Sequence, residues 1–275
     1  MFGNAIKNLR EASPWVHNIT NYVTVNDCAN IILACGASPI MADDLLEVEE
    51  ITSLCNSLVI NIGTLNERTI KSMLVAGKRA NELGHPVIFD PVGAGASRLR
   101  SDTAFQLLKE IKFSVIRGNA SEIKTLYNGI GTTKGVDADA ADRITEDRLS
   151  ETVKNARYLS ERTGAVIVIT GEIDIVTDVE KAYIVRNGHP MMSRITGTGC
   201  MLSAVLGALC AANPSNILDA AAEGVCAMGL CGELAFEKIT VNDEGTSSFK
   251  LHLIDFMSKM NLAILKDRAK IEEYS

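Results

Sequence analysis

Short apolar runs alternate with longer amphipathic stretches through the first two thirds of the chain. Four runs read as buried strands: SLVINIG (57–63), PVIFD (86–90), FSVIR (113–117) and AVIVIT (165–170). The stretches between them, such as 66–83 and 146–162, have helical spacing. This alternation is typical of βαβ units. Because the runs are apolar almost throughout, we expect a mostly parallel sheet that is buried on both faces.

The pattern changes after residue 170. The runs IDIVTD (173–178) and KAYIVRNG (181–188) predict an antiparallel pair with a turn near 179–181, forming a hairpin at the sheet edge. From Cys200 onward the chain is strongly helical, and this pattern continues to IEE (271–273). Since no repeat, low-complexity tract or linker interrupts the chain, we predict a single three-layer α/β domain over residues 1–275 with helices on both faces of the sheet.

Composition narrows the class of partner. The chain has 275 residues, 47% of them hydrophobic, and a formal net charge of −7 with no basic run. This argues against a nucleic-acid or membrane partner and favours a small molecule. Seven scattered cysteines without a CxxC pair indicate neither a zinc cluster nor a disulfide framework. The N-terminus has no apolar core of signal-peptide length and no segment reaches the length of a membrane span, so we expect a cytoplasmic protein.

Polar and glycine-rich residues follow each of the four runs, as NIGTLN, DPVGAGAS, RGNASE and TGEID. In an open α/β sheet the carboxyl ends of the strands share one crevice, which is where ligands bind. We therefore expect Asp90, at the end of the second run, to lie in a site. Thr170 and Gly171 close the fourth run, where a plain exit into a loop is an alternative. DPVGAGAS is a poor dinucleotide fingerprint, because Ser97 and Arg98 stand where a third glycine is needed.

The segment TGTGC (196–200 in the chain) joins a flexible turn to an apolar helix. Gly197, Thr198, Gly199 and Cys200 there predict an anion hole, in which backbone N–H groups and the helix dipole face one point. A thiol in this place is expected to have a depressed pKa and to act as a nucleophile, a weak base or an inert neighbour of the anion. The alternative is an ordinary helix start with Thr198 near the cap and an unreactive, buried cysteine.

The segment RGNASE (117–122) offers a second set of charged groups. Arg117 closes a strand, where its guanidinium is suited to a phosphate. Asn119 and Glu122 are three residues apart, so both can face one ion, and the carboxylate can hold Mg²⁺ through water. The alternative is a capping box, with Asn119 as the cap and Glu122 as its partner.

The segment HNITNYVTVN (17–26) lies near the N-terminus. Asn21 is expected at a helix start, where it either caps the helix or binds a ring nitrogen. Val23 and Met41, the latter ending the strand-like run ASPIM, are suited to pack on an apolar ring. We interpret His17 as a hydrogen-bonded structural histidine, because no serine, cysteine or acid at helical spacing completes a relay with it.

Seven motifs occur in order over nearly the whole chain: HNITN, GASPIMA, NIGTL, DPVGAGAS, RGNASEI, ITGE and TGTGC. Each is weak or moderate alone, but from His17 to at least Glu237 the ordered set resembles the hydroxyethylthiazole kinase family of the ribokinase-like superfamily. The resemblance implies transfer of the γ-phosphoryl group of ATP, with Mg²⁺, to the primary hydroxyl of 4-methyl-5-(2-hydroxyethyl)thiazole in thiamine salvage. It also implies a homotrimer with substrate pockets at the subunit interfaces.

The resemblance also implies residue roles. ATP is expected at Arg117, Asn119 and Thr170. The thiazole is expected at Asn21, Val23, Met41 and Gly197. Asp90 and Glu122 match acidic positions that hold magnesium through water. Cys200 replaces the aspartate base of ribokinase relatives, and we interpret it as a helper that touches the substrate hydroxyl, since phosphoryl transfer depends mainly on positioning and charge stabilisation.

Two segments depart from the family pattern. Asp43 and Asp44 stand where relatives more often have small or uncharged residues, and residues 244–250 (EGTSSFK) lack the usual glycine-proline-glycine. Rival readings within the superfamily are a hydroxymethylpyrimidine or pyridoxal kinase and an NAD(P)H-hydrate dehydratase, against which HNITN and ASPIMA count. A nucleotide-binding oxidoreductase lacks its fingerprint here. A regulatory binding protein is disfavoured by the motifs for binding the acceptor.

Overall fold

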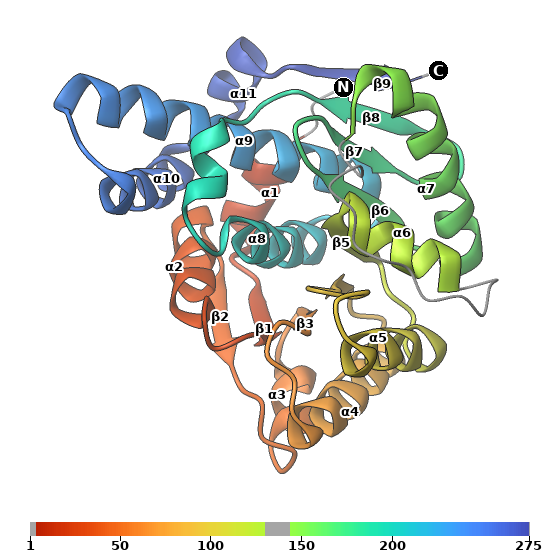
Figure 1. The fold of residues 1–275 in the computed structure, drawn as a ribbon. Helices are drawn as coiled ribbons and strands as arrows, with labels where there is room; N and C mark the ends of the chain where they lie inside the picture. Colours follow the sequence, from red (N-terminus) through yellow and green to blue (C-terminus); the bar gives the residue numbers. More distant parts are fainter. Residues whose placement is uncertain (1–3, 130–143, 275) are drawn as a thin grey trace.

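One twisted sheet runs through the molecule (Figure 1). The computed structural model describes residues 4–129 and 144–274. Within them the strand order is β2-β1-β3-β4-β5-β6-β7-β8-β9. The strands are β1 (Trp15–Ile19), β2 (Ser38–Met41), β3 (Ser57–Asn61), β4 (Val87–Asp90), β5 (Val115–Asn119), β6 (Val166–Thr170), β7 (Asp174–Thr177), β8 (Ala182–Val185) and β9 (Ile271–Tyr274). The first six are parallel and the last three are added antiparallel.

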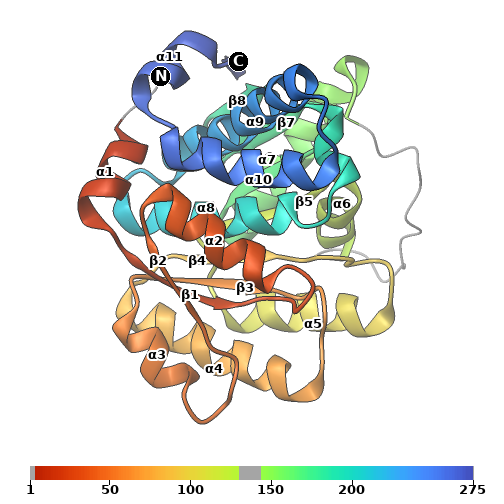
Figure 2. The same ribbon diagram turned by 90° about the vertical axis from the view of Figure 1, so that its left-hand side faces the viewer.

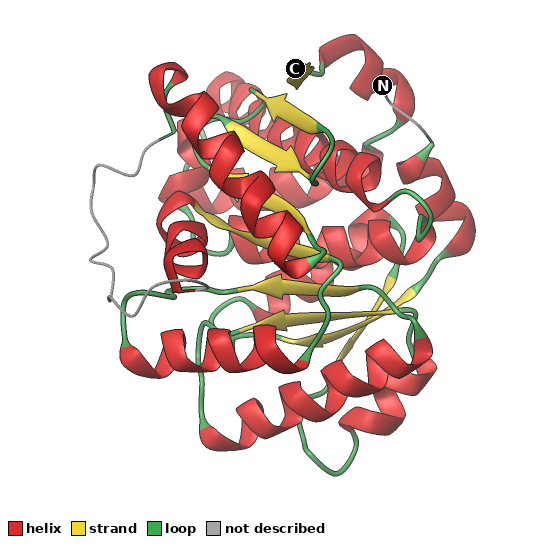
Figure 3. Cartoon of the chain, turned by 90° about the vertical axis from the view of Figure 1, so that its right-hand side faces the viewer, coloured by secondary structure: helices red, strands yellow, loops and turns green. Residues whose placement is uncertain are grey.

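Helices cover both faces of this sheet, as Figures 1 and 3 show. One layer comprises α1 (Ala5–Ala12), α2 (Val25–Cys35), α8 (Thr198–Ala212), α9 (Ile217–Asn242), α10 (Thr246–Lys259) and α11 (Leu262–Arg268). The other comprises α3 (Val48–Leu54), α4 (Glu67–Leu83), α5 (Arg98–Glu110), α6 (Ala120–Gly129) and α7 (Leu149–Thr163). Two short 3₁₀ turns, η2 (Glu146–Arg148) and η3 (Pro190–Arg194), complete the described elements. The predicted three-layer α/β fold is confirmed.

Side chains of the central strands alternate between two hydrophobic cores. On β3, Val59 faces the layer that contains α8, whereas Leu58 and Ile60 face the layer that contains α4. Period-two alternation with both faces apolar explains why the sequence runs are continuously hydrophobic. The burial of both faces leaves only the strand ends available for polar chemistry.

The sheet has a topological switch point at β1. The chain crosses from β1 to β2 through α2 in one layer and returns to β3, on the other side of β1, past α3 in the opposite layer. Connections that leave in opposite directions open a crevice at the carboxyl ends of the two strands. The loops after β1 and β3 therefore lie where a ligand is expected to bind.

The C-terminal end differs from the prediction. The hairpin of β7 and β8 is present, but β9 pairs antiparallel with β8 and takes the edge position. The predicted helix through residues 271–273 is therefore wrong. The last helix, α11, ends at Arg268, and the Lys270 backbone N–H donates to Asn187 Oδ1 at 2.7 Å where the chain enters β9. Within the described part of the chain, no helix is both long and apolar enough to cross a membrane.

Candidate active site

Asp90, at the end of β4, is a buried carboxylate with polar neighbours on one side. Its Oδ2 accepts hydrogen bonds from Ser203 Oγ at 2.8 Å and from Asn61 Nδ2 at 3.0 Å, and it lies 3.5 Å from Arg117 Nη1. Its Oδ1 is buried without a hydrogen-bond partner among the described residues. Burial raises the pKa of Asp90 to about 6, although the charge of Arg117 opposes the rise. The free oxygen is open to a further donor or cation.

Arg117 extends from β5 toward the first turn of α8. Its Nη2 donates to Thr170 Oγ1 at the end of β6, and a Cβ added at Gly199 would lie 2.8 Å from its Cζ. Only a glycine lets the guanidinium approach the helix this closely. Arg117 Nε is buried and makes no hydrogen bond to a described residue. The cation therefore lies beside the helix N-terminus, as a phosphate-binding arrangement requires.

The turn before α8 has the conformation expected of an anion hole. Gly197 has φ of +94° and precedes the first helical residue, Thr198. The first N–H groups of any helix have no intrahelical partner. In α8 no side chain caps them either. Thr198 Oγ1 instead donates to the carbonyl oxygen of Met192 at 3.4 Å. The uncapped N–H groups and the positive end of the helix dipole favour an anion at this turn.

Cys200 lies in this first turn, and its sulfur accepts from two amides. Asn21 Nδ2 and Asn61 Nδ2 are each 3.3 Å from Cys200 Sγ. The pKa of the thiol is nevertheless raised, first by burial and then by the negative charge of Asp90. The predicted depression of this pKa is therefore wrong, because desolvation and a nearby acid outweigh the helix dipole. At neutral pH the group is a thiol.

Asn119 and Glu122 form a reciprocal cap at the start of α6. Glu122 N–H donates to Asn119 Oδ1 and Asn119 N–H donates to Glu122 Oε2, each at 2.8 Å. Glu122 Oε1 also accepts from the Gly93 N–H at 2.8 Å. The capping-box alternative is thus confirmed. It does not remove Glu122 from the site, since its charge contributes to the raised pKa of Asp90. No group of three or more candidate metal ligands occurs among the described residues.

Asn21 serves the site from the turn after β1. Its Oδ1 accepts from both the N–H and the hydroxyl of Thr24 at 3.1 Å, and its Nδ2 donates to Asn61 Oδ1 at 3.0 Å. It does not cap α2, which was one of its two expected roles, because this helix begins only at Val25. The amide instead orders the turn and points its N–H group at Cys200.

The two predicted apolar contacts lie at neighbouring strand ends. Met41 ends β2, beside β1, and is half-buried against the core. Val23 follows β1 and is 57% exposed. Their contact with a thiazole stays a prediction. Asp43 and Asp44, which follow β2 and depart from the family pattern, pair with Arg68 at 3.7 and 3.3 Å. These ion pairs connect the loop after β2 to α4.

His17 is structural, as predicted. The ring is fully buried on β1, with Nε2 2.9 Å from the carbonyl oxygen of Ala42 and Nδ1 2.9 Å from Thr52 Oγ1. Burial lowers its pKa to about 4. The neutral ring, with both nitrogens paired, joins β1 to α3 through Thr52 and to the end of β2 through Ala42.

Sequence reasoning missed two residues of the site. Asn61, at the end of β3, contacts Asp90, Cys200 and Asn21. Ser203, one turn after Cys200, donates to Asp90. The signal for Asn61 was an amide at the end of an otherwise apolar strand. The signal for Ser203 was a hydroxyl three residues after the cysteine on an apolar helix.

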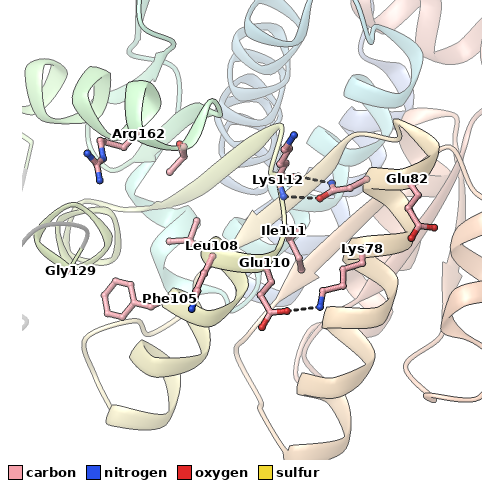
Figure 4. Close-up of a pocket in the computed structure, with 12 residues that line it drawn as sticks. Lys78, Glu82, Phe105, Leu108, Glu110, Ile111, Lys112, Gly129 and Arg162 are labelled. Carbon is pink, nitrogen blue, oxygen red and sulfur yellow. Dashed lines mark hydrogen bonds and ion pairs between the residues drawn. The ribbon is translucent and has the colours of Figure 1, made fainter.

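A groove of about 1010 Å³ lies at the amino ends of the central strands, away from Asp90 at the carboxyl end of β4 (Figure 4). Its walls include the ends of α4, α5 and α7, which lead into the amino ends of the central strands. Lys109 and Arg162 there occupy the last turns of α5 and α7, where the helix dipole itself favours cations. The groove is therefore separate from the cluster around Asp90.

Comparisons with known proteins identify the family. The Hydroxyethylthiazole kinase family matches residues 6–262. The chain belongs to this family. It is similar to the hydroxyethylthiazole kinase of Clostridium acetobutylicum, with 58% identity over 100% of both chains. It is also similar to that of Clostridium tetani, with 50% identity over 98% of this chain and 96% of the relative.

Solved structures agree on the fold. The hydroxyethylthiazole kinase protein of Pyrococcus horikoshii OT3 has a TM-score of 0.87 and 35% identity over 98% of each chain. The pyridoxal kinase of Staphylococcus aureus, solved with AMP-PCP and pyridoxal, has a TM-score of 0.57 over 80% of this chain and 88% of its own, at 13% identity. The second likeness concerns the fold alone, which is ribokinase-like.

Proposed function

We propose that this chain transfers the γ-phosphoryl group of ATP to the hydroxyl of 4-methyl-5-(2-hydroxyethyl)thiazole, a step of thiamine salvage. Its membership of the hydroxyethylthiazole kinase family supports this activity. The observation that carries the chemistry is the meeting of Arg117 with the uncapped first turn of α8 beside Asp90. Fixed donors and a cation around one point suit a reaction that develops charge on phosphoryl oxygens.

In this proposal the backbone N–H groups of residues 197–200 hold the transferring phosphoryl group. Arg117 balances its charge, and Thr170 fixes the guanidinium through Nη2. The oxygen of the alcohol forms the new bond to phosphorus while the bond to the β-phosphate oxygen breaks, so ADP leaves. Asn119, at the end of the strand next to β6, is proposed to contact the nucleotide.

The carboxylates of Asp90 and Glu122 fit a divalent cation. Asp90 Oδ1 is buried without a partner among the described residues, and the charge of Glu122 disfavours ionisation of Asp90. A nearby cation would offset both effects. Bound Mg²⁺ would neutralise charge on the phosphates of ATP. We propose that these two residues hold it through water, which agrees with both Glu122 oxygens already accepting from backbone N–H groups.

Cys200 is proposed to assist at the acceptor. Its raised pKa makes it a thiol at neutral pH, so it does not remove a proton from the alcohol before transfer. A loose transition state keeps the alcohol proton until late, when a phosphate oxygen or water can accept it. The Asn21 and Asn61 amides hold the sulfur in place through hydrogen bonds. Positioning of the hydroxyl is therefore the role assigned to this residue.

We further propose a homotrimer in which the thiazole lies between subunits, against Met41, Gly197, Asn21 and Val23. Exposed apolar side chains occur in the loops after β1 and β2: Tyr22 is 79% exposed and Leu46 is 95% exposed. Large apolar side chains exposed near a proposed site are consistent with contact with another chain. Light scattering should report about three times the 29.6 kDa mass of one chain. Full activity of a monomer at nanomolar dilution would contradict a shared pocket.

One assay tests the activity. ADP release should be followed with Mg-ATP and, separately, hydroxyethylthiazole, hydroxymethylpyrimidine and pyridoxal. We expect a clear preference for the thiazole, because the apolar side chains at the β1 and β2 ends suit a ring with few polar groups. Turnover of pyridoxal alone would overturn the assignment. Absence of ADP release with every alcohol would favour a binding protein.

A further inference from the structure

An ion pair between α2 and α10 borders the site. Lys250 Nζ lies 3.1 Å from Asp27 Oδ1 and 3.2 Å from Oδ2. Asp27 belongs to the first turn of α2 and its side chain is 13% exposed. The two helices pack side by side along the outside of the layer that contains α8 (Figure 2). Lys250 ends the segment 244–250, which departs from the family pattern.

Asp27 lies close to the anion hole. A Cβ added at Gly197 would lie 2.8 Å from Thr24 Cγ2 and 3.7 Å from Asp27 Oδ2. The carboxylate is thus next to the turn that is proposed to hold the transferring phosphoryl group. A poorly hydrated negative charge at this position opposes the binding of an anion unless a cation neutralises it.

The position of Lys250 is explained by that carboxylate and not by its own helix. It is the fifth residue of α10, near the N-terminus, where the helix dipole disfavours a cation. Surface pairs contribute little to stability, but this pair joins a largely buried acid to a cation beside a functional turn. Its effect is therefore expected on charge at the site more than on folding.

We infer that Lys250 is a positioning residue for phosphoryl transfer, which acts by neutralising Asp27 beside Gly197. The inference rests on the phosphoryl-binding role proposed for residues 197–200. Removal of Lys250 and removal of Asp27 are therefore expected to have different effects. Removal of the lysine leaves an uncompensated acid next to the anion hole, whereas removal of the acid leaves a cation that does not oppose the anion.

The experiment compares kcat and both KM values in four variants. Lys250→Met should lower kcat about 10-fold, with the KM for the thiazole changed less than about twofold. Asp27→Asn should stay within about twofold of the parent. The double variant Asp27→Asn/Lys250→Met should recover to within about threefold of the parent, because no uncompensated acid remains. Lys250→Arg, which keeps the charge, should remain close to the parent. Added salt should restore part of the loss in Lys250→Met.

Lys270→Met is the matched control. Lys270 pairs at 3.0 Å with Glu233, which is 12% exposed, and neither belongs to the proposed site. Its kcat should not change. Equal losses in Asp27→Asn and Lys250→Met, without recovery in the double variant, would mean that the pair only joins α2 to α10 and would overturn the inference. An unchanged kcat in Lys250→Met would overturn it as well.

The variant Gly199→Ala distinguishes failure of the role inferred for Lys250 from failure of the phosphoryl-binding role proposed for residues 197–200. Gly199→Ala displaces Arg117 from the same turn without touching Asp27 or Lys250. If Gly199→Ala impairs turnover and Lys250→Met does not, the anion hole stands and the role of Lys250 is rejected. If Gly199→Ala has full activity, the phosphoryl-binding role of residues 197–200 is itself rejected.

Discussion

Arg117 occupies the space that a side chain at residue 199 would need: a Cβ on Gly199 would lie 2.8 Å from the guanidinium carbon. The guanidinium is the mobile end of a long side chain, so it can move away, but only by leaving Thr170 and Asp90. Gly199 therefore controls where the cation lies relative to the helix N-terminus.

Gly199→Ala should separate activity from stability. Alanine is favoured over glycine in a helix by up to about 1 kcal/mol, which offsets part of the cost of separating Arg117 from Asp90, so the Tm should change little. The displaced guanidinium should raise the KM for ATP or lower kcat at least about 10-fold. Gly245→Ala is the control, because no atom lies within 4 Å of its added Cβ. Parental kinetics in Gly199→Ala would show that the guanidinium position is immaterial.

Arg117→Ala should impair nucleotide use selectively. A charge-assisted contact to phosphate contributes about 1.5–3 kcal/mol, which is a loss of roughly 10- to 150-fold in kcat/KM for ATP. The KM for the thiazole should hardly change. Arg98→Ala removes a surface pair with Asp102 and should behave like the parent. Steady-state kinetics with each substrate varied in turn gives the answer, and unchanged values for ATP would remove Arg117 from the site.

Local sequence patterns were sufficient for the fold and for part of the site. Continuous apolar runs predicted β3 to β6, since strands buried on both faces are apolar at their central positions. Asp90 and Arg117 were found because each ends such a run. The edge strand β9 was missed, because Ile271 to Tyr274 is short and its residues, IEEY, show no alternation of apolar and polar positions. Its pairing with β8 is a tertiary interaction that no local pattern encodes.

The electrostatics of the site depended on distant parts of the chain. The sequence predicted a lowered pKa for Cys200 from its place at a helix start, but the nearby Asp90 comes from a strand 110 positions earlier. The contacts that Asn61 makes with Cys200 and Asn21 likewise join segments that only the folded sheet brings together. The type of side chain at each position followed from the local sequence. The effect of burial and of distant charges on the pKa of Cys200 did not.

Stability should fall in acid through His17. The pKa of the buried ring is about 4, against an ordinary value of 6.5. Between these values the unfolded chain binds the proton and the native chain does not, so the free energy of unfolding decreases as pH falls from 6.5 to 4, by at most about 3 kcal/mol. Denaturant unfolding of the parent and of His17→Gln across this range separates this contribution from those of other groups. Asp90 acts in the opposite sense, since its raised pKa makes the native chain the better proton acceptor.

His17→Gln isolates the contribution of the ring. It should lower stability at pH 7, because the contacts with Ala42 and Thr52 are altered. The difference in stability between the parent and His17→Gln should shrink as the pH falls toward 4. A difference that stays constant with pH would mean that the ring does not titrate in this range.

Cys200 gives the last prediction. The Asn21 and Asn61 amides donate to its sulfur, and they would donate more strongly to a carboxylate oxygen. Cys200→Ala removes the acceptor but leaves the backbone donors, so activity should fall by a factor of about 10 to 10³ without reaching background. Measurement of kcat with saturating Mg-ATP and thiazole gives this factor.

Cys200→Asp should be as active as the parent or more active. Its charge approaches Asp90, but Arg117 and the N-terminus of α8 offset it, and an aspartate is the better acceptor for the substrate hydroxyl at neutral pH. Of the seven cysteines only Cys200 is not fully buried, so a thiol-modifying reagent should inhibit the parent and spare this variant. A phosphocysteine trapped during turnover, or a folded Asp variant without activity, would make Cys200 an obligatory nucleophile and would contradict the mechanism proposed for this site.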